Sequence, residues 1–96
     1  MSATATIRIT ASGVVPKEVT IAVGGRVTFV NEASRNYDVS SDPHPTHTDC
    51  PPVNTVNVLS PGQSRDTGAF PQARRCGFHD HNDPNNGDLR GTIVIQ

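Results

Sequence analysis

Hydrophobic and polar residues alternate along much of this chain, with the two-residue period of β-strands that bury one face. The alternation is clear in residues 4–10, 18–23 and 26–31. Gly24 and Gly25 separate the second and third of these segments, and a glycine pair is typical of a tight turn between paired strands. We therefore predict that residues 18–23 and 26–31 form a β-hairpin.

The rest of the chain predicts more short strands joined by turns. Residues 41–53 lack this period and contain four prolines, so they are predicted to form a long loop, and loops of this length are often functional. Seven or eight strands in 96 residues predict an all-β protein, a Greek-key β-sandwich or barrel in one domain over residues 1–96. The further strands are expected at residues 37–40, 54–59, 65–70, 74–79 and 91–96.

Charge and hydropathy narrow the classes of partner. The charged fraction is 18% and the formal net charge is -1, so we expect no nucleic-acid-binding surface. No apolar run reaches the roughly 18 residues of a membrane span. The start of the chain, Met1-Ser2-Ala3, lacks the basic and apolar regions of a signal peptide. We expect a monomer that is either cytosolic or already stripped of its signal.

The four histidines lie in two short segments, and this clustering is the strongest sign of chemistry. His44 and His47 lie in the proline-rich loop, while His79 and His81 are two residues apart on a predicted strand, so their side chains leave the same face. Neutral imidazole is the commonest protein ligand for metals and suits copper, zinc or nickel. Four separate histidines in polar loops would usually be solvated surface residues. Because the four histidines are clustered in two segments, a metal site is as well supported by the sequence pattern as solvated surface histidines are.

The two cysteines allow two interpretations. A disulfide between Cys50 and Cys76 would bring the two histidine segments together and would suit an exported protein. Alternatively, Cys76 and His79 have the spacing at which a thiolate and an imidazole share one metal ion. No serine lies in a nucleophile-elbow pattern and no glycine-rich phosphate loop precedes a helix, so we expect no enzyme activity.

Several segments together resemble the cupredoxin family, the small copper proteins that include plastocyanin and azurin. The resemblance implies a Greek-key β-sandwich with a metal site at one end. The typical type 1 copper ligands are only partly present, because Tyr37 stands where the family has its first histidine and Leu89 stands where it has methionine. The matching segments are residues 16–21, 27–31, 59–64 and 89–95.

The remaining type 1 ligands depend on the alignment. One alignment keeps Cys76 and His79 as a thiolate and an imidazole ligand. The other puts Asp80 and Asp83 in the family's ligand places, which removes the type 1 centre. We favour the second alignment, because strand alternation then turns Cys76 inward with Phe78, well placed for a bridge to Cys50.

The chain also resembles a cupredoxin-like subgroup with a D-P-H-P-x-H-x-D segment, here residues 42–49, and an H-D-H segment, here residues 79–81. This likeness implies a histidine-rich site that differs from the blue-copper one. We therefore expect a periplasmic or extracellular protein that binds copper, or zinc as the alternative metal, for copper storage, delivery or redox, with a redox or copper-delivery protein as partner. Its expected ligands are His44, His47, His79 and His81, beside a Cys50–Cys76 disulfide.

Two other functions are kept as alternatives. One is a mononuclear type 1-like electron-transfer protein that uses Cys76 and His79 as ligands. The other is a metal-free cupredoxin-like domain that serves as a binding module, which the loss of ligands at Tyr37 and Leu89 favours.

Overall fold

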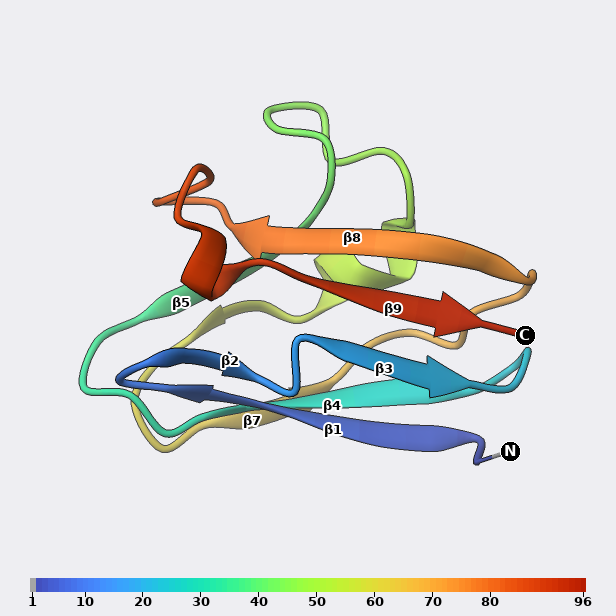
Figure 1. The fold of residues 1–96 in the computed structure, drawn as a ribbon, viewed down its shortest axis with the longest axis horizontal. Helices are drawn as coiled ribbons and strands as arrows, with labels where there is room; N and C mark the ends of the chain where they lie inside the picture. Colours follow the sequence, from blue (N-terminus) through green and yellow to red (C-terminus); the bar gives the residue numbers. More distant parts are fainter. Residues whose placement is uncertain (1) are drawn as a thin grey trace.

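Two β-sheets pack face to face in the computed structural model, which describes residues 2–96 (Figure 1). This confirms the predicted β-sandwich. Within the described residues there are nine strands rather than seven or eight, because Gly13–Val15 forms a short strand that the alternation did not reveal. The strands are β1 (Thr4–Thr10), β2 (Gly13–Val15), β3 (Glu18–Ile21), β4 (Arg26–Asn31), β5 (Tyr37–Ser41), β6 (Asn57–Leu59), β7 (Ser64–Asp66), β8 (Arg74–Asp80) and β9 (Gly91–Ile95).

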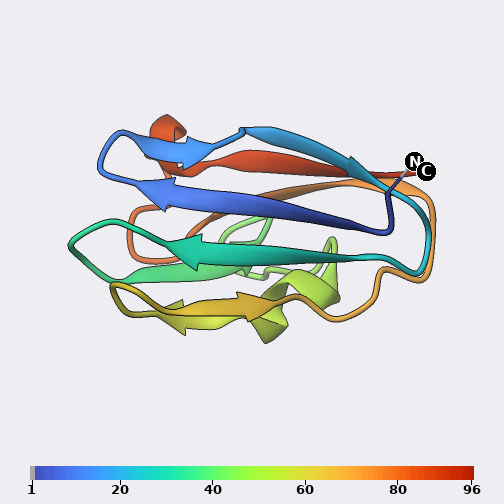
Figure 2. The ribbon, with the colours of Figure 1, turned by 90° about the horizontal axis from the view of Figure 1, so that it is seen from below.

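The strands are divided between a four-stranded sheet, in the order β2-β1-β4-β7, and a five-stranded sheet, in the order β3-β9-β8-β5-β6. Two neighbouring pairs are parallel, β1 with β4 and β3 with β9, and the other pairs are antiparallel. Figure 2 shows the two layers from below. Among residues 2–96 there is no helix with the length and apolar character needed to cross a membrane.

The predicted hairpin of residues 18–23 and 26–31 is wrong. β3 pairs with β9 in one sheet and β4 pairs with β1 in the other, so the chain changes sheets between them. At the crossing, the Gly24 amide donates to the Phe70 carbonyl and the Phe70 amide donates to the Gly25 carbonyl. A side chain at Gly25 would also lie 2.3 Å from the Ala3 carbonyl oxygen, so this glycine permits a close approach of backbones rather than a hairpin turn.

The strand predicted at residues 54–59 is shortened to β6, because the short 3-10 helix η1 (Pro51–Thr55) precedes it. Two prolines begin this helix, where their missing amide protons cost no helical hydrogen bond. The strand predicted at 65–70 is shortened to β7, since the buried Thr67 hydroxyl turns inward and accepts a hydrogen bond from the Val27 amide. A second 3-10 helix, η2 (Gly87–Leu89), comes directly before β9.

The core lies between the sheets and is built from the apolar sides of the alternating strands. Phe29 of β4 and Phe78 of β8 meet across it, edge to face, with ring centroids 5.0 Å apart. The disulfide cysteines, Cys50 and Cys76, are buried in the same core. The five-stranded sheet therefore has one face sealed by packing and one outer face free for a site. Its inward side chains include Val19, Ile21, Tyr37, Val39, Phe78, Ile93 and Ile95.

Candidate metal centre

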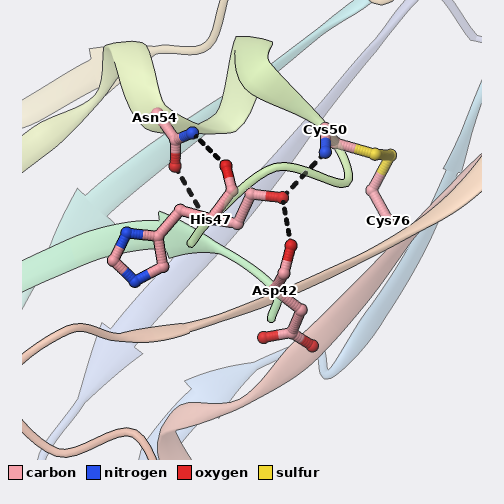
Figure 3. The surroundings of a disulfide bond; sticks show 6 residues. Asp42, His47, Cys50, Asn54 and Cys76 are labelled. Carbon is pink, nitrogen blue, oxygen red and sulfur yellow. Dashed lines mark hydrogen bonds between the residues drawn. A yellow bond between two sulfur atoms is a disulfide. The ribbon is translucent and has the colours of Figure 1, made fainter. Parts of the chain in front are cut away.

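The loop between β5 and η1 folds back over β8 and rises beyond it in Figure 1. Its base is closed by a hydrogen bond of 3.0 Å from the Asp49 amide to the Asp42 carbonyl. Asn54 ties it down from η1, donating to the His47 carbonyl at 2.7 Å and accepting from the Ser41 amide at 2.8 Å. Figure 3 shows the two bonds of Asn54, with the imidazole of His47 pointing away from the disulfide.

Strand alternation on β8 separates the side chains as predicted. Cys76 and Phe78 are fully buried and face the core. His79 and His81 leave the opposite face, where the loop brings His44 and His47 to meet them. His79 is only 1% exposed although it lies on the outer face, whereas His81 is exposed.

The other three imidazoles each place one nitrogen close to Nε2 of His47. This atom lies 3.3 Å from Nδ1 of His44, 3.3 Å from Nε2 of His79 and 3.3 Å from Nδ1 of His81. The donor nitrogens of His44, His47 and His81 all lie within 4.8 Å of one another. His79 is not part of this mutually close group and adjoins it through Nε2 of His47. In a tetrahedral site with metal–nitrogen distances of about 2.0–2.1 Å, neighbouring ligand nitrogens are about 3.3–3.4 Å apart.

Hydrogen bonding alone does not account for these contacts. An imidazole nitrogen offers either one N–H donor or one lone pair. Nε2 of His47 has three nitrogen neighbours at 3.3 Å, so at most one of them is its hydrogen-bond partner. The donor set therefore fits a shared cation better than it fits a network of neutral rings.

Asp42 fixes the orientation of His79. Its Oδ1 accepts a hydrogen bond of 2.6 Å from Nδ1 of His79, which leaves the lone pair on Nε2 directed at the cluster. Its Oδ2 lies 3.4 Å from the guanidinium of Arg90. The carboxylate occupies the space over Gly77, where a Cβ would come within 2.1 Å of Oδ2.

Two features set His47 apart from the other histidines. Burial, and then the neighbouring imidazoles of His79, His81 and His44, lower the pKa of His47, while Asp38 opposes the shift. A lowered pKa keeps the ring neutral, which is the form that binds metal. The backbone of His47 is left-handed, with φ of 53°, a conformation that costs energy in a non-glycine residue and occurs often at functional sites.

Cys50 and Cys76 form a disulfide, so the disulfide interpretation of the two cysteines is confirmed. The bridge joins the end of the histidine loop to β8, with the Cα atoms 5.8 Å apart. A sulfur held in a disulfide is not a thiolate, and Cys76 also faces the core, away from His79. The alternative ligand set of Cys76 and His79 therefore does not form in this structure.

Residues at the positions where the resemblance placed type 1 ligands make hydrogen bonds within the protein. The Tyr37 hydroxyl donates to the Leu89 carbonyl at 2.6 Å inside the core. Asp80 is buried and accepts from the amides of Asp38 and Asn82. The histidine cluster thus lies on the outer face of the sheet, while Tyr37, Asp80 and Leu89 are buried in the sandwich. The fourth of these positions, Asp83, lies in the turn after β8, with its side chain 46% exposed.

Three residues around the cluster were missed by sequence reasoning. The alternation pattern places Asn54 in a strand, the resemblance includes Arg90 only within a matching segment, and neither predicts a role for Gly77. Their roles depend on where the loop lies over β8, which no local pattern encodes. The one usable signal was Gly77, since a glycine inside a strand often marks a close approach.

The comparisons with known proteins agree on the fold. No family model and no curated protein matches the chain. A purple cupredoxin from Nitrosopumilus maritimus, 17% identical, matches with a TM-score of 0.70 over 96% of this chain and 99% of that one. Reduced auracyanin from Roseiflexus castenholzii, 18% identical, gives 0.68 over 100% and 98%. Oxidised plastocyanin from Dryopteris crassirhizoma, 13% identical, gives 0.70 over 95% and 99%.

This coverage at low identity shows that the chain has the cupredoxin fold. The resemblance in the sequence is therefore confirmed for the fold, and the match extends over almost the full length of each of these three structures. The identity of the metal and its ligands stays a prediction.

Proposed function

We propose that this chain, whose fold is that of the cupredoxins, binds one copper ion through His44, His47, His79 and His81 on the outer face of the five-stranded sheet. The observation that carries the proposal is the position of Nε2 of His47, which lies 3.3 Å from a nitrogen of each of the other three rings. The ring of His79 is already oriented by Asp42, as in a typical carboxylate–histidine–metal arrangement.

Copper is favoured over other metals on two grounds. The neighbouring folds in the comparisons are cupredoxins, and an all-imidazole donor set binds Cu(II) more strongly than the other first-row divalent ions. Zinc has no support from these comparisons and serves as the competitor in the tests. Because the site has no thiolate, bound Cu(II) should lack the intense band of blue copper.

Copper binding, storage or delivery is the role that we infer from the exposure of the site. His79 is buried and His47 is partly buried, whereas His44 and His81 are exposed. A partner or chelator therefore reaches the site from the side of His44 and His81 while the other two rings hold it in place. The disulfide supports a periplasmic or extracellular location, where such bonds persist.

The test is a copper titration followed by optical and electron paramagnetic resonance spectroscopy. We expect one equivalent of Cu(II) with nitrogen hyperfine structure and no intense blue band. His47→Ala should lower the affinity at least about 100-fold, the order of effect seen when metal-site residues are lost. Thr48→Ala, an exposed change in the same loop, is the matched control and should bind as the parent does.

Three results would reject the proposal. The first is an unchanged affinity in His47→Ala. The second is a strong blue band, which would indicate a thiolate ligand. The third is a melting temperature that copper does not raise, because only a ligand of the native state stabilises it.

A further inference from the structure

A cleft of about 310 Å³ opens beside the histidine cluster. We call it the Arg90 cleft. Two of its lining residues, His44 and His79, belong to the cluster, while Asn85 and Arg90 come from the segment before β9. Asp42 and two prolines complete the lining. Its volume falls at the lower end of the range for small-molecule sites, which is about 300–1,000 Å³.

Most of the side-chain N–H donors of Arg90 have no partner among residues 2–96 in this cleft. Its side chain is 49% exposed, and its contact with Asp42 is a single one, from one terminal nitrogen to Oδ2 at 3.4 Å. A guanidinium carries five N–H donors in a planar fork that matches the two oxygens of a carboxylate. One edge of the fork is therefore free to bind an anion without breaking the pair with Asp42.

The charge of the site also favours an anion. Four neutral imidazoles leave the charge of a divalent ion uncompensated, and Asp42, the carboxylate hydrogen-bonded to His79, is already paired with Arg90. A small anion in the Arg90 cleft would lie beside the guanidinium of Arg90 and beside a divalent ion held by the imidazoles.

We propose that the Arg90 cleft binds the carboxylate of a small copper chelator of the amino-acid class, so that copper enters and leaves the histidine site in exchange with that chelator. The inference rests on the proposed copper site. Arg90 holds the carboxylate, and exposed His44 is the ring next to which the incoming donor atom arrives. The role of Arg90 is positioning: it recruits the chelator and does not bind the metal.

The experiment has one arm without metal and one arm with metal. In the first, acetate is titrated into the metal-free protein and the Arg90 Nε–Hε signal is followed by NMR. In the second, transfer of copper from its bis-glycine complex is timed by stopped flow and compared with transfer from a copper–imidazole complex. The variants are Arg90→Gln, Arg90→Lys and, as the matched control, Arg74→Gln, which removes an exposed arginine away from the cleft.

Arg90→Gln should weaken acetate binding and slow transfer from the glycine complex by about tenfold each, the ratio expected for one charge-assisted hydrogen-bonded contact. Arg90→Lys should restore part of both effects, and Arg74→Gln should change neither. Transfer from the imidazole complex should be unchanged in Arg74→Gln, and Arg90→Gln should slow it less than it slows transfer from the glycine complex. Equal acetate binding in Arg90→Gln and Arg74→Gln would overturn the inference. If copper fails to bind the parent protein, the copper site is wrong, and the acetate arm still decides the anion site.

Discussion

At the scale of single residues, Tyr37 makes a buried hydrogen bond at a position where the resemblance to the cupredoxins places a ligand. It stands where the resemblance placed a histidine ligand, and its hydroxyl donates to the carbonyl of Leu89, which stands in the place of the methionine. Burial, and then the charges of Asp80 and Asp42, raise the pKa of Tyr37. The phenol therefore stays a neutral donor, and the pair acts as a structural hydrogen bond in the core.

Replacing Tyr37 by Phe should lower the free energy of unfolding by about 1–2 kcal/mol, because it leaves the buried Leu89 carbonyl without this partner. Urea denaturation measures the change. Thr28→Val is the control, since it removes a solvent-exposed hydrogen bond of the same 2.6 Å length and should cost less. A spectrophotometric titration of the parent should show no phenolate near the ordinary pKa of about 10. Equal losses in the two variants would contradict a buried role for Tyr37.

Gly77 gives a second prediction at this scale. A Cβ here would lie 2.1 Å from Oδ2 of Asp42, so Gly77→Ala should push that carboxylate away from both His79 and Arg90. We expect lower stability and at least about tenfold weaker copper binding, within the range found when a residue that orients a metal ligand is lost. Isothermal titration calorimetry and thermal melting measure the two effects.

The control for this change is Gly68→Ala. A Cβ at Gly68 would meet Pro52 only at an ordinary contact distance of 3.5 Å, so this variant should keep both the stability and the copper affinity of the parent. Copper affinity that falls equally in both variants would show that the effect is not specific to Asp42.

Residue patterns in the sequence could predict which way side chains on β8 point, but not the contacts that the histidine loop makes with the sheet. Alternation on one strand was sufficient to turn Cys76 inward and His79 and His81 outward, because this depends only on local geometry. The contacts of Arg90 and Asn54 depend on how an aperiodic loop lies over the sheet. Those contacts are tertiary, so the sequence pattern gave no sign of them.

At the scale of elements, alternation located strands well and paired them poorly. β1 and β4 coincide with the segments predicted from the sequence. The predicted hairpin failed because a two-residue period marks a half-buried strand without identifying its neighbour, and the partners of β3 and β4 are distant in sequence. The buried Thr67 and the proline-initiated η1 helix likewise ended strands for reasons of packing and capping.

The disulfide connects two elements of the site, the histidine loop and β8. Replacing both Cys50 and Cys76 by alanine should cost about 3.5 kcal/mol of unfolding free energy, the loop-entropy value for a bridge between residues 26 apart in sequence. Copper affinity should also fall, because the loop with His44 and His47 loses its covalent tie to the strand with His79. Denaturation and calorimetry separate the two effects. An unchanged affinity would mean that the hydrogen bonds of Ser41 and Asn54 suffice to hold the loop.

For the whole molecule, the core between the sheets is closed, and the histidine cluster lies on the outer face of the five-stranded sheet. The core positions that resemble type 1 ligands are filled by hydrogen-bonded groups, while the four histidines meet outside β8. A metal lost from such a site leaves the core intact. We therefore expect the metal-free protein to stay folded, with a stability that depends on the protonation of His47.

That dependence has a definite sign. The pKa of His47 is lowered from 6.5 by burial and by the imidazoles of His79, His81 and His44, with Asp38 opposing. The unfolded chain therefore takes up this proton at a higher pH than the folded one. Stability from His47 is complete above the unfolded pKa and is lost as the pH falls through the folded pKa. Urea unfolding of metal-free protein between about pH 8 and about pH 5 measures the loss. His47→Gln should show a smaller loss, and Thr48→Ala should behave as the parent; equal pH dependence in all three would contradict the assignment to His47.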